Sequence, residues 1–145
     1  MDLVCRRAQF LTDAGGAVVE LLEGTELVYR AASGSAARSL GLRVDTRHSL
    51  SGLCLRTAEA MRCDDTDRDG RVDAAACRWV GIRSMVLVPV VRDGQAGGVL
   101  AVVSAGVGAF ADRDVWTLRQ LAEVLAESLG PFEDGAGQAV GPARA

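Results

Sequence analysis

The sequence lacks lysine and asparagine altogether and has one histidine, His48, and only 4% aromatic residues. Without lysine, the chain cannot use the lysine of a phosphate-binding P-loop or form a lysine Schiff base. Long hydrophobic runs are also missing: no apolar stretch approaches the roughly 18 residues that cross a bilayer. The start, MDLVCRRAQF, has no apolar signal-peptide region. We therefore expect a cytoplasmic protein with reduced thiols and no membrane partner.

The chain has enough apolar material for one folded domain. Of its 145 residues, 49% are hydrophobic and 24% are charged, as in a globular domain with a sizeable core. The net charge is −3, and every basic residue is an arginine, spread from Arg6 to Arg144 without a basic stripe. Nucleic-acid binding is therefore not expected.

Periodicity and turn signals predict an antiparallel sheet flanked by helices. Two hairpins are expected, one over residues 16–32 and one around Asp93-Gly94. Pro89, in the second hairpin, cannot donate to a strand ladder and so predicts an edge position or a bulge. Helices are expected at residues 3–11, from Ser49 or Ser51 to about Ala58, at 74–80 and at 112–129, with short strands at 42–44 and 60–63. The expected organisation is a single domain over residues 1–131 and a disordered tail over 132–145.

Three cysteines, Cys54, Cys63 and Cys77, lie close together in the sequence and are its clearest hint of chemistry. They fit buried packing, because cysteine is among the most often buried residues. They also fit redox chemistry, which requires a thiol with a lowered pKa. A zinc site with His48 is the third interpretation, but the spacing lacks the C-x2–4-C pair typical of such sites. We expect neither a metal nor a cofactor.

The segment 64–73, DDTDRDGRVD, carries five aspartates against two arginines. Its Asp-x-Asp-x-Asp-Gly spacing mimics the start of a calcium-binding loop. Ala76, however, stands where such a loop needs a bidentate glutamate. The segment is therefore expected to be a solvated acidic loop.

The segments SLSGLCLRTAEAMRCDDTDRDGRVD, GIRSMVLVPV, GGVLAVVS and AFADRDVWTLRQLAEVLAESL resemble a GAF domain, and the resemblance covers about residues 3–129. It implies an α+β, GAF/PAS-like fold with a central antiparallel sheet of about six strands, flanked by helices. It also implies a cavity for a small molecule, roofed by residues 49–80. A non-catalytic sensory role in bacterial signal transduction follows, with a homodimer paired through terminal helices and a signalling output domain or partner protein. The Cys-His pair of bilin-binding members is missing, because His48 precedes Cys54 by six residues.

From their places in this pattern, we expect the following residues to bind the small molecule: Tyr29, Cys54, Cys63, Cys77, Trp79, Arg83 and Met85. An alternative comes from a second resemblance, to the free methionine-R-sulfoxide reductases, which are enzymes of the same fold. That resemblance implies that Cys77 is the nucleophile and Cys54 the resolving cysteine, with Arg78 or Arg83 supplying positive charge. The chain departs from those enzymes at Arg78, where they carry aspartate, and at Leu55-Arg56, where they carry Gly-Thr.

Overall fold

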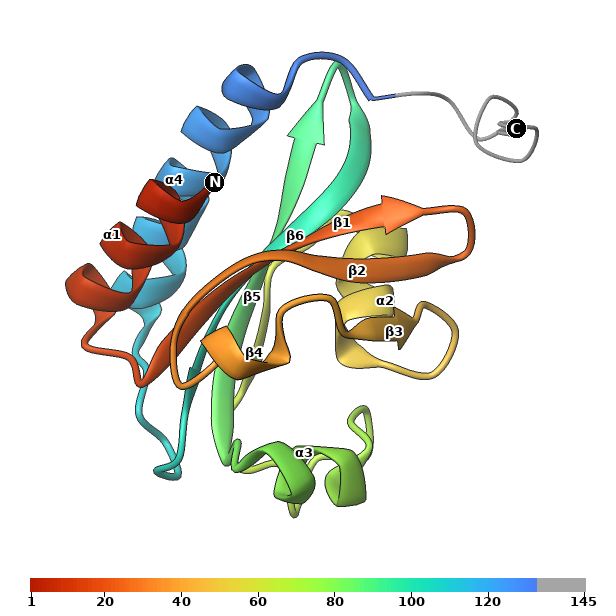
Figure 1. Ribbon diagram of the computed structural model, residues 1–145. Coiled ribbons are helices and arrows are strands. Elements are labelled where there is room, and N and C mark those ends of the chain that lie inside the picture. The colour runs from red at the N-terminus through yellow and green to blue at the C-terminus, as the bar shows by residue number, and fades with distance from the viewer. Residues whose placement is uncertain (133–145) are drawn as a thin grey trace.

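The computed structural model describes residues 1–132 and consists of a six-stranded sheet with helices on both faces (Figure 1). The elements in chain order are α1 (Asp2–Thr12), β1 (Gly16–Glu23), β2 (Glu26–Gly34), the 3-10 helix η1 (Ala37–Ser39), β3 (Arg43–Asp45), α2 (Leu50–Thr57), β4 (Met61–Cys63), α3 (Ala74–Val80), β5 (Ser84–Arg92), β6 (Gln95–Ser104) and α4 (Asp112–Leu129). The predicted α+β class, the two hairpins and the helices are confirmed. The 3-10 helix η1 was not predicted.

All neighbouring strands are antiparallel, in the order β3-β2-β1-β6-β5-β4. The two predicted hairpins, β1-β2 and β5-β6, join side by side through β1 and β6. Two short strands, β3 and β4, close the two edges of the sheet. Most of the ladder therefore comes from two long hairpins that are contiguous in sequence, which is why turn signals located them well.

Pro89 lies in β5 at a point where the strand has only one partner. The partner strand β4 begins at Met61, which pairs with Leu87, so β5 has no neighbour on that side at Pro89. A bulge follows between Val90 and Val91. The edge position predicted from this proline is thus present, and the bulge lies one residue further along the strand.

The two faces of the sheet bury two separate apolar cores, as strand alternation requires. Val19, Leu100 and Val102 pack with Leu118 and Leu125 of α4 on the face covered by α1 and α4. The opposite face carries the second core under α2 and the loops around it, formed by residues that include Val18, Leu27, Leu87, Val99 and Cys54. The 49–80 segment therefore covers its own face of the sheet, separate from the terminal helices (Figure 1).

The end of α4 is tied to the tip of the β5-β6 hairpin. Arg92, the last residue of β5, donates from Nη1 to the carbonyl oxygens of Ala126 (3.1 Å) and Glu127 (2.9 Å), two of the carbonyls that a helix leaves without partners at its end. Phe132, which was expected to begin the tail, packs against the core instead, and its ring occupies the space a Cβ would take at Gly97. The rest of the predicted tail lies outside the described residues.

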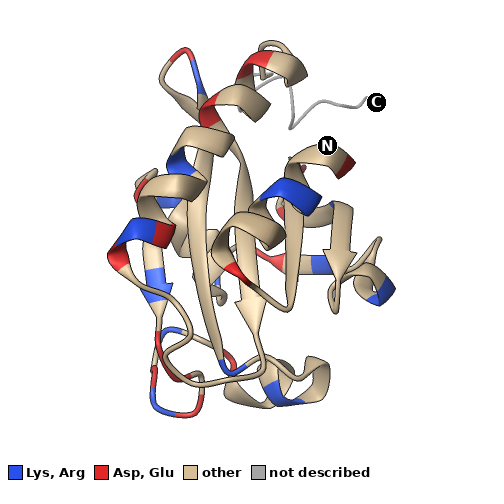
Figure 2. Cartoon of the chain, turned by 90° about the vertical axis from the view of Figure 1, so that its left-hand side faces the viewer, with Lys and Arg blue, Asp and Glu red and all other residues tan. Residues whose placement is uncertain are grey.

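Several large apolar side chains stay exposed on the outer side of α1 and α4. Phe10 and Trp116 keep 82% and 64% of their surface, and Leu3, Leu11 and Val124 are also exposed. Trp116 is therefore a surface residue and not part of the core. Figure 2 views the molecule from this side and shows charged residues of both signs spread over the chain. No helix within residues 1–132 is long and apolar enough to cross a membrane.

Candidate ligand cavity

A cavity of about 270 Å³ lies between the sheet and the 49–80 segment, as the sequence predicted. The sheet supplies Tyr29 from β2, Val44 from β3 and Met85 from β5, and the wall is almost entirely apolar. The remaining lining residues come mainly from α2, α3 and their flanking loops: Leu42, Ser49, Leu50, Ser51, Val72, Asp73, Ala76, Cys77, Trp79, Val80 and Ile82. Such a space, apolar with a few polar groups, has the character of a small-molecule site.

Ser49 caps the start of helix α2: its hydroxyl accepts from the amide of Gly52 at 3.0 Å, as expected for an N-cap serine. Gly52 also lets the preceding loop approach the helix. A Cβ at this position would lie 1.8 Å from the carbonyl oxygen of Thr46, so only glycine fits. Ser49 and Gly52 together fix where α2 starts and hold its first turn at the cavity.

Helix α3 is the outer wall of the cavity and is only lightly packed. Asp73 caps its start by accepting from the amide of Ala76 at 3.1 Å, and Gly81 ends it in the left-handed conformation. None of its residues is buried. Trp79 lines the cavity while 90% of its surface is exposed, so its ring stands at the rim.

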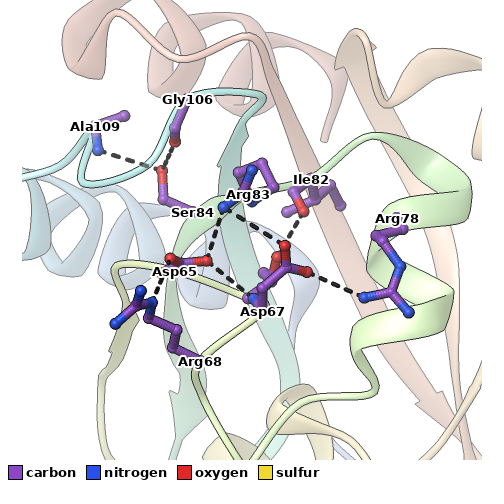
Figure 3. A network of polar contacts seen from close by, with 10 residues as sticks. Asp65, Asp67, Arg68, Arg78, Ile82, Arg83, Ser84, Gly106 and Ala109 are labelled. Atoms are coloured by element: carbon purple, nitrogen blue, oxygen red, sulfur yellow. Dashed lines mark hydrogen bonds and ion pairs between the residues drawn. The ribbon is translucent and has the colours of Figure 1, made fainter.

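The acidic loop is largely exposed to solvent, as expected, and its aspartates also pair with arginines. Asp65 and Asp67 both pair with Arg83, at 3.1 and 3.6 Å, and Asp67 also pairs with Arg78 at 3.1 Å (Figure 3). Between them Thr66 is fully buried and donates to the carbonyl oxygen of Ile82 at 2.9 Å. These contacts attach the loop to the residues before β5 and, through the pairing of Asp67 with Arg78, to α3.

Asp69 turns to Arg71, which donates to both of its carboxylate oxygens. This pairing holds the pKa of Asp69 well below its usual range. Of the three aspartates in the calcium-like spacing, Asp65 and Asp67 thus pair with Arg83, and Asp69 pairs with Arg71. Their carboxylates form no metal-binding group within residues 1–132. Arginine, with five N–H donors, suits such carboxylate contacts.

Glu20, a buried carboxyl group that the sequence analysis missed, lies on β1 facing the 49–80 segment. It is only 1% exposed; its Oε2 accepts from the hydroxyl of Ser51 at 3.0 Å, while Oε1 has no hydrogen-bond partner. Burial raises the pKa of Glu20 to about 7. Glu20 pairs with Tyr29 across the β1-β2 ladder and bonds Ser51. It is therefore adjacent to two residues that line the cavity. Its place within the apolar run AVVELL is the sequence signal that could have revealed it.

Four of the seven predicted site residues line the cavity: Tyr29, Cys77, Trp79 and Met85. The other three lie elsewhere. Cys54 and Cys63 are buried in the core beneath the cavity, and Arg83 is engaged by Asp65 and Asp67. Leu50, Val72 and Ile82 line the cavity but were not predicted, because an apolar lining residue has the same pattern as a core residue.

The cysteine thiols all lie in environments that favour the neutral form. Burial, followed by the charge of Glu20, raises the pKa of Cys54 to about 12. Burial and a hydrogen bond to Asp69 raise that of Cys63 to about 12. The pKa of Cys77 is raised by burial and then by Asp73 and Asp67. Since thiolates are the reactive species, none of these sites is activated.

The proposed zinc ligand set of His48 and the three cysteines is not assembled. Within residues 1–132, no three His, Cys, Asp or Glu side chains are grouped as a metal site requires. All four cysteines of the chain are free. The cysteine cluster of the sequence is thus split between the cavity wall, with Cys77, and the core behind it.

An antiparallel sheet with a cavity between one face and a layer of short helices defines a recognisable class of α+β domains. The model of the GAF domain family matches residues 1–129, and the chain belongs to that family. A comparison with curated proteins finds no match.

Solved structures support the fold. The GAF domain of an Acinetobacter phosphoenolpyruvate-protein phosphotransferase is similar with a TM-score of 0.77 at 19% identity, over 97% of this chain and 83% of that one. The second GAF domain of DevS from Mycobacterium smegmatis gives 0.71 at 22% identity, over 88% of each chain. A type II free methionine-R-sulfoxide reductase from Thermoplasma acidophilum gives 0.74 at 18% identity, over 88% of this chain and 87% of that one. GAF domains of larger proteins and a free methionine-R-sulfoxide reductase thus share this fold, so the fold alone does not decide whether the chain is an enzyme.

Proposed function

We propose that this GAF domain is a non-catalytic sensor that binds a small molecule in the cavity between the sheet and the 49–80 segment. The observation that carries the proposal is the apolar cavity of about 270 Å³ with Tyr29, Cys77 and Met85 in its wall. The domain acts in the cytoplasm of a bacterium, where its four free cysteines stay reduced. Its output passes to a signalling domain or partner protein.

Binding changes the domain through α3, the least buried part of the cavity wall. A ligand shifts a conformational equilibrium only by binding one state more tightly than the other. Trp79 stands exposed at the rim, so closure of α3 over a ligand would bury its indole ring. That burial supplies the differential affinity.

Native mass spectrometry of freshly purified protein tests the proposal, because it reports bound molecules and subunit number together. Ala76 lines the cavity, whereas its neighbour Ala75 on the same helix is exposed and does not line it. We expect a co-purified or added ligand to be lost in Ala76→Phe, which fills the cavity, and kept in Ala75→Phe. Equal binding by the two variants would place the ligand elsewhere.

The alternative function, a free methionine-R-sulfoxide reductase with Cys77 attacking and Cys54 resolving, has the shared fold in its favour. The environment of the thiols weighs against it. Arg78 and Arg83, which were to lower the pKa of Cys77, are paired with Asp67 and Asp65. Sulfoxide turnover with a dithiol that stops in Cys77→Ser would establish the enzyme, and its absence at high protein concentration would exclude it.

A homodimer through the terminal helices is part of the proposal. The exposed Phe10 of α1 and Trp116 of α4 lie on neighbouring helices and offer apolar area for a second copy. Light scattering should show a dimer that Phe10→Ser with Trp116→Ser converts to monomer. If the unchanged protein is a monomer at all concentrations, the homodimer is refuted. The proposal of ligand binding does not depend on that result.

A further inference from the structure

A second hollow, of about 320 Å³, adjoins the cavity and differs from it in charge. Arg47, His48, Arg56 and Arg71 line it. The two spaces share the residues Ser49, Val72 and Asp73, so they adjoin where the start of α2 lies near the start of α3. We call the second space the basic hollow.

Close approach of two segments creates the basic hollow. Gly52 lets the loop at Thr46 lie against α2, and Arg56, one turn further along the helix, donates to the carbonyl oxygen of Thr46. This places Arg47 and His48 of the loop beside Arg56 of the helix. Ser49, the N-cap of α2, also lines the hollow, so the partial positive charge at the start of the helix lies close to Arg47.

The arginines keep donors available for an incoming anion. Arg56 makes no ion pair within residues 1–132. Arg47 keeps 82% of its side-chain surface and approaches Asp45 only at 3.7 Å, through Nε, which leaves its terminal nitrogens free of that contact. Arg71 has a structural role instead, because its guanidinium group donates to both carboxylate oxygens of Asp69.

One carboxylate, that of Asp73, lies in the shared wall. Its Oδ1 accepts from the amide of Ala76 and caps α3, so that oxygen faces its own helix. Asp45 likewise accepts from the amide of Arg47 at 2.9 Å. These acids hold backbone in place, while the guanidinium groups of Arg47 and Arg56 supply the N–H donors of the hollow.

We propose that the cavity and the basic hollow together bind one amphipathic anion, an apolar molecule whose carboxylate, sulfonate or phosphate group reaches Arg47 and Arg56 past Ser49. This inference rests on the proposed function and adds the chemical class of the ligand. The apolar part occupies the space bounded by Val72, Ile82 and Met85, and the acidic group stays at the solvent-facing end. An uncharged apolar molecule fills only the first space.

Two fluorescent probes with the same ring system test the proposal. One is 1-anilinonaphthalene-8-sulfonate, and the other is N-phenyl-1-naphthylamine, which lacks the sulfonate. Only the binding that Ala76→Phe abolishes is counted, so that dye on the exposed face of α1 and α4 is excluded. We expect both probes to enter the cavity, with the sulfonate bound more tightly and in a salt-dependent manner.

Charge-removing variants locate the anionic end. Arg47→Gln and Arg56→Gln should each weaken sulfonate binding about twofold to fivefold, the range of exposed charge pairs, and leave N-phenyl-1-naphthylamine unchanged. Arg113→Gln on α4, exposed on the other face of the sheet, makes the same change in net charge and should affect neither probe.

The outcomes separate the two proposals. If N-phenyl-1-naphthylamine enters the cavity but the sulfonate binds no more tightly, or ignores both arginine variants, the anion site is overturned and the cavity stands. If neither probe shows a component that Ala76→Phe removes, the cavity itself is overturned as a ligand site.

Discussion

The buried carboxyl group of Glu20 predicts how the stability of the domain depends on pH. Its pKa in the folded protein, about 7, lies above the ordinary value of 4.5. The folded state therefore binds a proton between these two values that the unfolded state has released. Stability from this group is fully present below pH 4.5 and is lost as the pH rises toward 7.

The magnitude follows from the two pKa values. At about 1.4 kcal/mol per pKa unit, moving the pKa from 4.5 to about 7 corresponds to about 3 kcal/mol of unfolding free energy. Glu20→Gln removes the ionisation but keeps an oxygen for the Ser51 hydroxyl. The unfolding free energy of the unchanged protein minus that of the variant should thus fall by about 3 kcal/mol between pH 4.5 and pH 8.

Urea unfolding at a series of pH values measures this difference. Taking the difference between the unfolding free energies of the two proteins cancels the contribution of groups that titrate equally in both. The matched control is Glu59→Gln, at an exposed glutamate, which should leave the dependence of unfolding free energy on pH unchanged. Parallel curves for the unchanged protein and Glu20→Gln from pH 4.5 to pH 8 would refute the reasoning. They would mean that Glu20 is solvated or paired in the folded state.

Further changes test how the elements are held. Gly52→Ala should destabilise strongly, because its Cβ would meet the Thr46 carbonyl oxygen at 1.8 Å, whereas Gly70→Ala has nothing within 4 Å and should be nearly neutral in chemical denaturation. Leu118→Ala, in the core, should cost about 2–5 kcal/mol of unfolding free energy, while Trp116→Ala, exposed on the same helix, should cost far less; equal losses would contradict the assigned faces. Ser84→Ala leaves the Gly106 carbonyl and the Ala109 amide without their buried partner and should cost about 1–3 kcal/mol; an unchanged melting temperature would contradict it.

Local signals in the sequence sufficed for most of the fold. Glu23-Gly24 and Asp93-Gly94 mark turns whose flanking strands are neighbours in the chain, so the hairpins follow from residues close in sequence. Pro89 revealed an unpaired stretch of β5, because the absence of an N–H is a property of the residue itself. Features that depend only on nearby residues can be predicted in this way.

The site was less predictable because it is built from distant segments. The pairing of Arg83 with Asp65 joins residues 18 positions apart, and no local pattern distinguishes that role from ligand binding. Cys54 and Cys77 share a segment, but one faces the core and the other the cavity. Which face a residue of a short helix presents depends on tertiary packing, which the sequence does not show directly.

The strand β5 joins the cavity to the end of α4, which matters for any signal that leaves the domain. Met85, near its start, lines the cavity, and Arg92, at its end, grips the last carbonyl groups of α4. At about 3.4 Å per residue, this one strand, with its bulge between Val90 and Val91, connects the site with the far end of the helix. Movement of β5 along its own axis would therefore pull on the C-terminal end of α4 directly, without passing through the helical layer above the cavity.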